Sequence, residues 1–476
     1  MSLNQTRAQK IRGALLSIAQ NESVFLFVAF VSYSFLSTNV LAWYADSIAA
    51  FNRFVVLPWG GALCLLRLCR AQERKLEPHA DIRFLVLLYA WIVVPFGIRF
   101  GLTAINANDW FHCMVAFFGV YALITEETAQ RREMLLDVAG ALFAALSFVM
   151  GALLLYCAFT VQTFGTELSE TPFGIYENMY FLSAGFHYNT TGMFAVCCTL
   201  MSLLGVARRR HPLAKLAHLI PSLMMAAVVV LSQSRTARYS MLGAWAVGCY
   251  GVVAGSAAIP KKSLRQLAAV AAGVAVLVGG YMGAAVMTDS AIRHYESVLS
   301  GKKEASVFAS AVAEEAQQPE AQPDEPQAAD KQELLGRGFG DMTFTDRTTI
   351  WGKVIAAWLE EPKNMVIGFG LGKISAITDG MTTHNAYLGF ITNYGLIGFA
   401  LLCCFFGSMA GPMCRAFFAP KGRAHAGDRV LAMIVVAALL TSLMESEPLG
   451  AMSPMNAVMM FSMAMLTARG RDLKTA

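Results

Sequence analysis

The chain has 476 residues, of which 56% are hydrophobic and only 14% are charged. Soluble domains usually carry about 25% charged residues, so this composition excludes an ordinary soluble protein and indicates a membrane protein. The net charge of +5 is small, and we expect membrane lipids but no nucleic acid among the partners.

Apolar runs long enough to cross a bilayer recur along the chain. They predict about twelve transmembrane spans, at residues 24–44, 54–66, 84–98, 110–125, 134–160, 191–206, 216–233, 239–258, 266–287, 385–411, 430–444 and 452–468. Each span must be helical, because backbone groups in lipid have no water to bond. We therefore expect an all-α polytopic protein. The first run is too long for the core of a cleavable signal peptide.

Basic residues alternate between the two sides of these spans. One set of loops and terminal segments holds 24 of the 37 Lys and Arg residues. The opposite set, outside its one long loop, holds only Arg53, Arg99, Arg235 and Arg238. The positive-inside rule then predicts that both termini are cytoplasmic. It places residues 162–190 and the long loop 288–384 on the other side.

The spans and the loop divide the chain into four parts. Residues 1–215 hold spans one to six, 216–287 hold spans seven to nine, 288–384 form the outer loop, and 385–476 hold spans ten to twelve. Within the loop, residues 304–332 are rich in Glu, Gln, Ala, Pro and Asp. This composition predicts a disordered insertion.

An amphipathic segment follows the insertion. Ile350, Val354, Ile355 and Trp358 share one helical face, and Pro362 ends the pattern. We expect a short helix that lies on the membrane surface.

Arginines on the outer side are candidates for binding an anion. Arg235 and Arg238 lie in "LSQSRTARYS", at the outer junction of spans seven and eight, and Arg347 lies in "DRTTIW". A guanidinium bonds phosphate oxygens through two parallel N–H groups. The alternative for each is a structural ion pair, for Arg347 with Asp346 or another neighbouring acid. Arg53 and Arg99 fit interfacial anchoring better than catalysis.

His384, followed by Asn385, lies where the long loop enters span ten. Thr382 or Thr383 is available to cap that helix. A histidine near a helix N-terminus tends towards the neutral form, which can accept a proton. This placement, with arginines at the same depth, suits a general base; the alternative is a structural histidine. A second outer histidine, His187, is a weaker candidate.

Two acidic residues, Glu445 and Glu447, lie in the loop between the last two spans and could pair with the arginines. We interpret both as structural. The ten cysteines all fall within apolar runs or at their basic ends, which indicates packing rather than disulfides.

Several motifs of catalysis do not occur. The sequence has no GxxxxGK[ST], HExxH or GxSxG pattern and no paired-acid motif on the outer side. We therefore expect no metal and no cofactor. An enzyme at this face must use a substrate that is already activated and held in the membrane.

The outer motifs together resemble a known family. "SQSRTARYS", "DRTTIW", "IGFGLG" and "HNAYLGFITNYGLIG", in this order over about residues 220–410, resemble the core of the O-antigen ligase and polymerase superfamily. His384–Asn385, nine residues and then Gly395 and Gly398 is similar to the signature of the O-antigen ligase family. The insertion leaves the alignment of Arg337 open.

The resemblance implies a glycosyltransferase of the GT-C type in the bacterial inner membrane, with a periplasmic active site. The donor would be O-antigen on undecaprenyl pyrophosphate, and the acceptor a lipid A–core oligosaccharide. By the same resemblance, His384 is the catalytic residue, while Arg235 and Arg347, with Arg238 beside them, bind the pyrophosphate. Asn385, Arg53 and Arg99 are possible supporting residues. The family is expected to need neither nucleotide nor metal.

Other functions remain open. An O-antigen polymerase uses the same donor but extends a second lipid-linked glycan, and the His-Asn spacing favours the ligase over it. Protein O-glycosylating relatives usually carry further sequence after the shared core. A lipid-linked oligosaccharide transporter is disfavoured, because the connection between spans six and seven is short and charged residues within spans are few.

Overall fold

The computed structural model describes residues 12–36, 50–73, 79–100, 121, 124–125, 127–164, 173–176, 181–185, 188–256, 258–259, 261–314, 345–370, 373–378, 383–419, 426–445 and 454–475. Most of them are helical. The helices are α2 (Glu22–Leu36), η1 (Asn52–Val56), α4 (Leu57–Glu73), α5 (Ala80–Phe100), α8 (Ala129–Thr160), α9 (Tyr188–Arg208), α10 (Pro212–Leu231), α11 (Arg235–Ala254), α12 (Lys262–Glu314), α14 (Thr345–Leu359), α15 (Pro362–Ile367), α16 (Lys373–Ile377), α17 (Ala386–Phe418), α18 (Ala426–Met444) and α19 (Pro454–Thr475).

Among the described residues, six helices are long and apolar enough to cross a membrane: α8, α9, α10, α12, α17 and α18. Two further helices, Arg12–Ala19 and Glu22–Ser32, are bent by 67° relative to each other. If this pair counts as one span, the number of candidate spans rises to seven. The protein is therefore a polytopic helical membrane protein, but a count of twelve spans is not confirmed. The predicted span 110–125 falls mostly outside the described residues.

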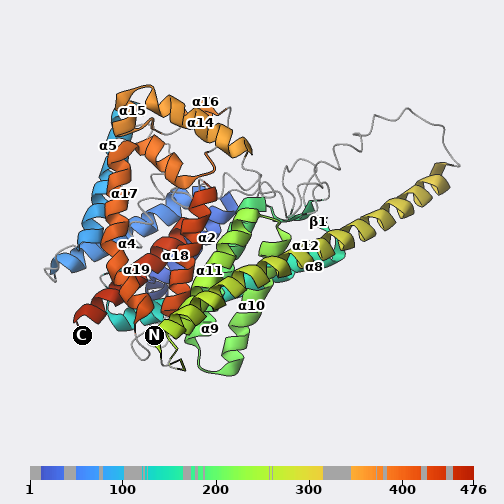
Figure 1. The fold of residues 1–476 in the computed structure, drawn as a ribbon, viewed down its shortest axis with the longest axis horizontal. Coiled ribbons are helices and arrows are strands. Elements are labelled where there is room, and N and C mark those ends of the chain that lie inside the picture. The colour runs from blue at the N-terminus through green and yellow to red at the C-terminus, as the bar shows by residue number, and fades with distance from the viewer. Residues whose placement is uncertain are drawn as a thin grey trace, which may run out of the picture.

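The helices form a bundle in which α8, α9, α10, α11, α17, α18 and α19 contribute to one continuous core (Figure 1). α19 lies at its centre and is buried from Met455 to Gly470. Its neighbours include α17, α18 and α2, while α11 packs between α12 and α18. The last predicted span is thus a central helix that meets protein on all sides.

Ion pairs join the helix ends at one end of the bundle. Arg208, at the end of α9, bonds Glu133 at 2.6 Å and Asp137 at 2.9 Å on α8. Arg469 on α19 pairs with Asp428 and Glu133. These basic residues belong to different predicted cytoplasmic segments, so the structure brings those segments to one side. The unit formed by α14, α15 and α16 lies at the opposite end (Figure 1).

A small antiparallel sheet corrects the all-α expectation. Strands β1 (Thr163–Phe164), β2 (Phe173–Tyr176) and β3 (Phe181–Ala184) pair in the order β1-β2-β3. Ile175 and Leu182 face each other in the ladder and are fully buried. The aromatic and branched residues of these short runs favour strand over helix.

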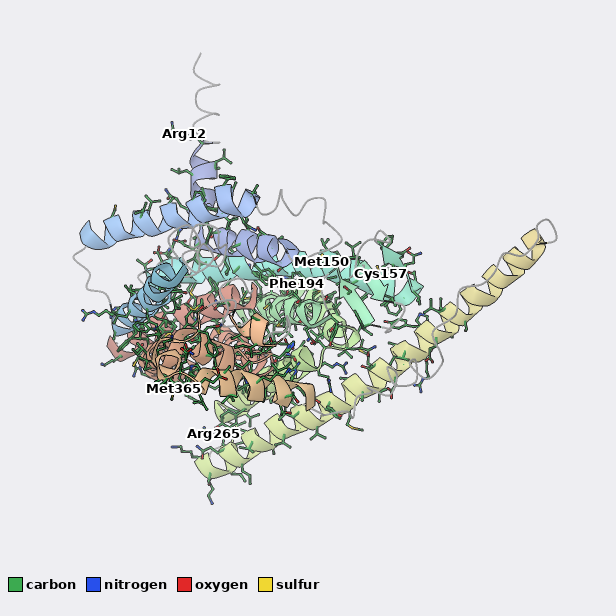
Figure 2. The ribbon with its side chains drawn as sticks, turned by 90° about the horizontal axis from the view of Figure 1, so that it is seen from above. Arg12, Met150, Cys157, Phe194, Arg265 and Met365 are labelled. Atoms are coloured by element: carbon green, nitrogen blue, oxygen red, sulfur yellow. The ribbon has the colours of Figure 1, made fainter. Side chains whose placement is uncertain are left out.

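Helix α12 is longer than the span predicted at 266–287. It continues to Glu314 and reaches a length of about 80 Å at 1.5 Å per residue. Its far end extends away from the bundle, whereas Arg265 marks the end that lies beside it (Figure 2). Residues 304–314 of the predicted disordered insertion are therefore helical. Alanine and glutamate favour helix there, and no proline occurs between Pro260 and Pro319. Residues 315–332 lie outside the described residues.

The unit of α14, α15 and α16 has a core of its own. Ile350 and Val354 on α14 pack against Phe369 and Ile374. The amphipathic helix was therefore predicted at the right place, but these two side chains face a protein core and not lipid. Ile355 lies on the other side of α14 and is 40% exposed.

Candidate functional site

The carboxylate of Glu445, directly after α18, gathers side chains from four other segments. Its Oε2 lies 3.3 Å from Nδ1 of His384, and its Oε1 lies 3.3 Å from Nη2 of Arg347. Oε1 also accepts hydrogen bonds from Asn189 Nδ2 at 3.0 Å and from Thr236 Oγ1 at 3.2 Å. The Glu445 side chain is only 8% exposed. A charge so buried needs these partners, because desolvation alone would disfavour it.

His384 lies in a tight turn before α17. Its φ of 45° is in the left-handed region, which costs a non-glycine residue about 1–3 kcal/mol. Two contacts hold the turn: Trp351 Nε1 donates to Thr383 O at 2.6 Å, and Thr383 Oγ1 donates to Asn385 O at 2.9 Å. The expected threonine cap is wrong. Asn385 caps α17 instead, because its Oδ1 accepts from Leu388 N at 2.9 Å.

The contact with Glu445 decides which nitrogen of His384 can act as a base. A carboxylate only accepts hydrogen bonds, so Nδ1 of a neutral His384 must carry the proton that it donates. Nε2 then keeps its lone pair. The His384 side chain is 33% exposed, so a substrate can approach it. The pair has the chemistry of a histidine base oriented by an acid.

Arg347, at the first turn of α14, is held by the residues around Glu445. Its Nη1 donates to Met444 O at 2.6 Å, and its side chain remains 24% exposed. The ion-pair alternative for Arg347 is thus observed, with Glu445 as its acid. A guanidinium has five N–H groups, and two contacts leave others for an anion.

The start of α11 carries Arg235 and Arg238 beside Thr236. Arg235 is exposed, whereas Arg238 is buried, with only 6% of its surface exposed. Ser234 caps the helix by accepting from Ala237 N at 3.2 Å. The structure therefore puts Arg235 at the surface next to a residue that binds Glu445. Arg238 points into the protein interior, which fits its structural alternative.

Asn189, at the start of α9, was not predicted. Its amide donates to Glu445 and accepts from Ser234 Oγ at 2.9 Å. Its position at the predicted outer end of a span, in "HYNTTG", is the sequence signal that could have indicated it. Glu445 was predicted to pair with arginines, but its central place was not.

A break in α17 at Gly395 is interlocked with the glycine loop after α15. Phe369 N donates to Thr392 O at 2.8 Å, and Gly370 N donates to Asn393 O at 3.0 Å. A Cβ on Gly395 would lie 2.1 Å from Val366 O, and one on Gly368 would lie 2.2 Å from Asn393 O. The N–H groups of this loop thus bond the carbonyls of Thr392 and Asn393, at the break where the regular hydrogen bonding of α17 is interrupted. Gly368 and Gly395 therefore let the backbone segments before and after His384 pack closely against each other.

The remaining candidates are not placed in the site. Arg53 lies in η1 and Arg99 near the end of α5, but the structure does not describe their side chains. His187, Arg337 and Glu447 lie outside the described residues. Trp91 Nε1 on α5 donates to Tyr394 O at 2.9 Å. Among the described residues, no group of three His, Cys, Asp or Glu side chains could hold a metal.

Comparison with known protein families gives a match over part of the chain. Residues 220–403 match the model of a family described as O-antigen ligase, whose members are glycosyltransferase-like enzymes. This confirms the resemblance predicted over residues 220–410. The match contains Arg235, Arg347 and His384, whereas Asn189 precedes it and Glu445 follows it. No curated protein sequence matches the chain.

Proposed function

We propose that this protein, whose residues 220–403 carry the domain of the O-antigen ligase family, is an O-antigen ligase. It transfers a glycan from undecaprenyl pyrophosphate to a sugar hydroxyl of a lipid A–core oligosaccharide. The observation that carries this proposal is the contact of His384 Nδ1 with Glu445 at 3.3 Å, within a family of membrane-bound glycan transferases.

In the proposed reaction, His384 is the general base. Nε2 takes the proton of the acceptor hydroxyl as its oxygen bonds to the anomeric carbon of the donor sugar. The bond from that carbon to the pyrophosphate breaks, and undecaprenyl pyrophosphate leaves with the electron pair. Glu445 stabilises the imidazolium that forms. A positioned base of this kind contributes about 10²–10⁴-fold to a rate.

The leaving pyrophosphate needs cations. Arg235 is exposed at the start of α11, and Arg347, whose side chain is 24% exposed, lies 3.3 Å from Glu445, the acid that contacts His384. Guanidinium groups can stabilise a developing negative charge in place of a metal ion. The proposal therefore needs neither metal nor nucleotide, as the resemblance to the O-antigen ligase family implies.

We place the site on the periplasmic face of the inner membrane and both termini in the cytoplasm. The support is that the ion-paired basic ends and the His384 site lie at opposite ends of the bundle. In a variant without the ten native cysteines, Lys363→Cys should react with an impermeant thiol reagent from the periplasm, whereas Arg210→Cys should not. Labelling of only Arg210→Cys would reverse the orientation.

Lipopolysaccharide from a deletion strain tests the function. Loss of all attached O-antigen, together with accumulation of the lipid-linked polymer, is the result expected of a ligase. A core that carries a single repeat unit would instead indicate a polymerase. Donor that accumulates only on the cytoplasmic leaflet would indicate a transporter.

A further inference from the structure

Asn189 connects two parts of the site that lie far apart in the sequence. Its Nδ2 is 3.0 Å from Glu445 Oε1, across 256 positions of the chain. Its Oδ1 is 2.9 Å from Ser234 Oγ, the hydroxyl that caps α11. One side chain thus touches both the acid that orients His384 and the helix that presents Arg235.

The donor and acceptor groups of these side chains fix the direction of each hydrogen bond between Glu445, Asn189 and Ser234. Since a carboxylate only accepts, Asn189 must turn its NH₂ group towards Glu445. Its carbonyl oxygen therefore faces Ser234, whose hydroxyl must donate. The other side of that hydroxyl accepts from Ala237 N at 3.2 Å. Asn189 can satisfy both neighbours in only one orientation.

Burial makes the arrangement rigid. Asn189 is 9% exposed, Glu445 6% and Ser234 0%. Gly192 lies one turn further along α9 and lets α9 and α11 approach closely. A Cβ at Gly192 would lie 2.6 Å from Ala237 Cβ and 2.8 Å from Ser234 Cβ, at the start of α11. Arg347 also bonds Glu445 Oε1, but its side chain is 24% exposed and its other bond is to the adjacent Met444 O, so it does not link Glu445 to another helix as Asn189 does.

We propose that Asn189 is a positioning residue for the base. It fixes the Glu445 carboxylate so that Oε2 faces Nδ1 of His384, and it ties that orientation to the capped start of α11. This inference rests on the proposed function, since it concerns the same reaction. Asn189 touches neither reacting group and acts through Glu445.

The decisive variant is Asn189→Asp, which keeps the shape but places a second carboxylate against Glu445. Two adjacent carboxylates tend to share a proton, and added negative charge also favours protonated histidine. The charged group in contact with His384 is Glu445, and Arg347 bonds the same carboxylate; on α11, Arg235 is adjacent in sequence to Thr236, which also bonds Glu445. Both effects favour a protonated pair. The acid limb of the pH–rate profile therefore moves to higher pH, and activity is lost at a higher pH than in the wild type.

The experiment uses purified full-length protein with lipid-linked O-antigen and lipid A–core, both extracted from the deletion strain. In Asn189→Asp we expect the acid limb to shift upwards by about one pH unit. In Asn189→Ala we expect kcat to fall about 10-fold with an unchanged KM for donor, as for the loss of one hydrogen bond to a charged group. Asn21→Asp adds the same charge at the start of α2, where Asn21 Oδ1 bonds Ser23 N, and should shift nothing.

Wild-type kcat and an unshifted acid limb in both Asn189 variants would overturn the inference. Should Asn189→Asp fail to fold, kcat of Asn189→Ala within twofold of the wild type overturns it alone. A wild-type protein that transfers no glycan overturns the proposed function, and the role of Asn189 with it. Transfer that depends on His384 but not on Asn189 leaves the function standing and removes only this inference.

Discussion

Glu445 Oε2 lies 3.3 Å from His384 Nδ1, although 61 positions separate the two residues in the chain. The contact joins the turn before α17 to the end of α18. It selects the tautomer in which Nε2 can accept a proton, and it explains why a histidine in this turn can be a base.

Glu445→Gln should lower transfer by about 10²–10⁴-fold, since an amide no longer requires Nδ1 to be the protonated nitrogen. Donor binding should change little. Transfer kinetics of the purified variant measure this, with Glu360→Gln, an exposed acid directly after α14, as the matched control. Equal loss in both variants would show that the effect is not specific to the pair.

Arg235→Lys and Arg347→Lys keep the positive charge but lose the planar arrangement of N–H groups. We expect kcat/KM for the donor to fall about 10–100-fold in each, the cost of one strong hydrogen bond to a phosphate oxygen. Arg347→Lys should also lose thermal stability, because Met444 O loses its partner. Arg210→Lys, at the exposed turn after α9, is the control. Near-normal kinetics in both site variants would reduce these arginines to anchors.

Gly395→Ala should destabilise the protein by at least about 2 kcal/mol and abolish most activity. Its φ of 69° and ψ of −177° fall in a region used almost only by glycine, and the added Cβ would meet Val366 O. Thermal unfolding in detergent measures the loss. Gly407→Ala on the same helix has no neighbour within 4 Å and should be neutral. A stable, active Gly395→Ala variant would contradict the interlock.

The exposed apolar side chains of the α14–α15 unit should contact the bilayer. Ile355 is 40% exposed, Leu359 51% and Val366 45%, on the side of the unit away from its own core. A spin label on Ile355→Cys should therefore collide more with lipid-soluble oxygen than with a water-soluble nickel complex. The label on Lys353→Cys, about 200° around the helix, should show the opposite. Equal accessibility at both positions would place the unit in water.

The sequence was sufficient for the elements that depend on local pattern. Apolar runs located most of the described helices, and the order of motifs made His384, Arg235 and Arg347 the candidates for the site. It could not identify Glu445 as the centre, because its partners Asn189, Thr236, Arg347 and His384 come from four separate segments. Nor could it show that Ile350 and Val354 face protein, since an amphipathic pattern marks a buried face without saying what covers it.

The most direct test of the account is glycan transfer by His384→Gln, measured with purified protein and both lipid substrates. The amide can keep a hydrogen bond to Glu445 but cannot take a proton at neutral pH. We therefore expect transfer to fall about 10²–10⁴-fold while donor binding and detergent-solution stability persist. Wild-type activity should also decline on acidification, because a protonated imidazole has no free lone pair. A His384→Gln variant that transfers glycan at a near-normal rate would contradict the assignment of His384 as the base.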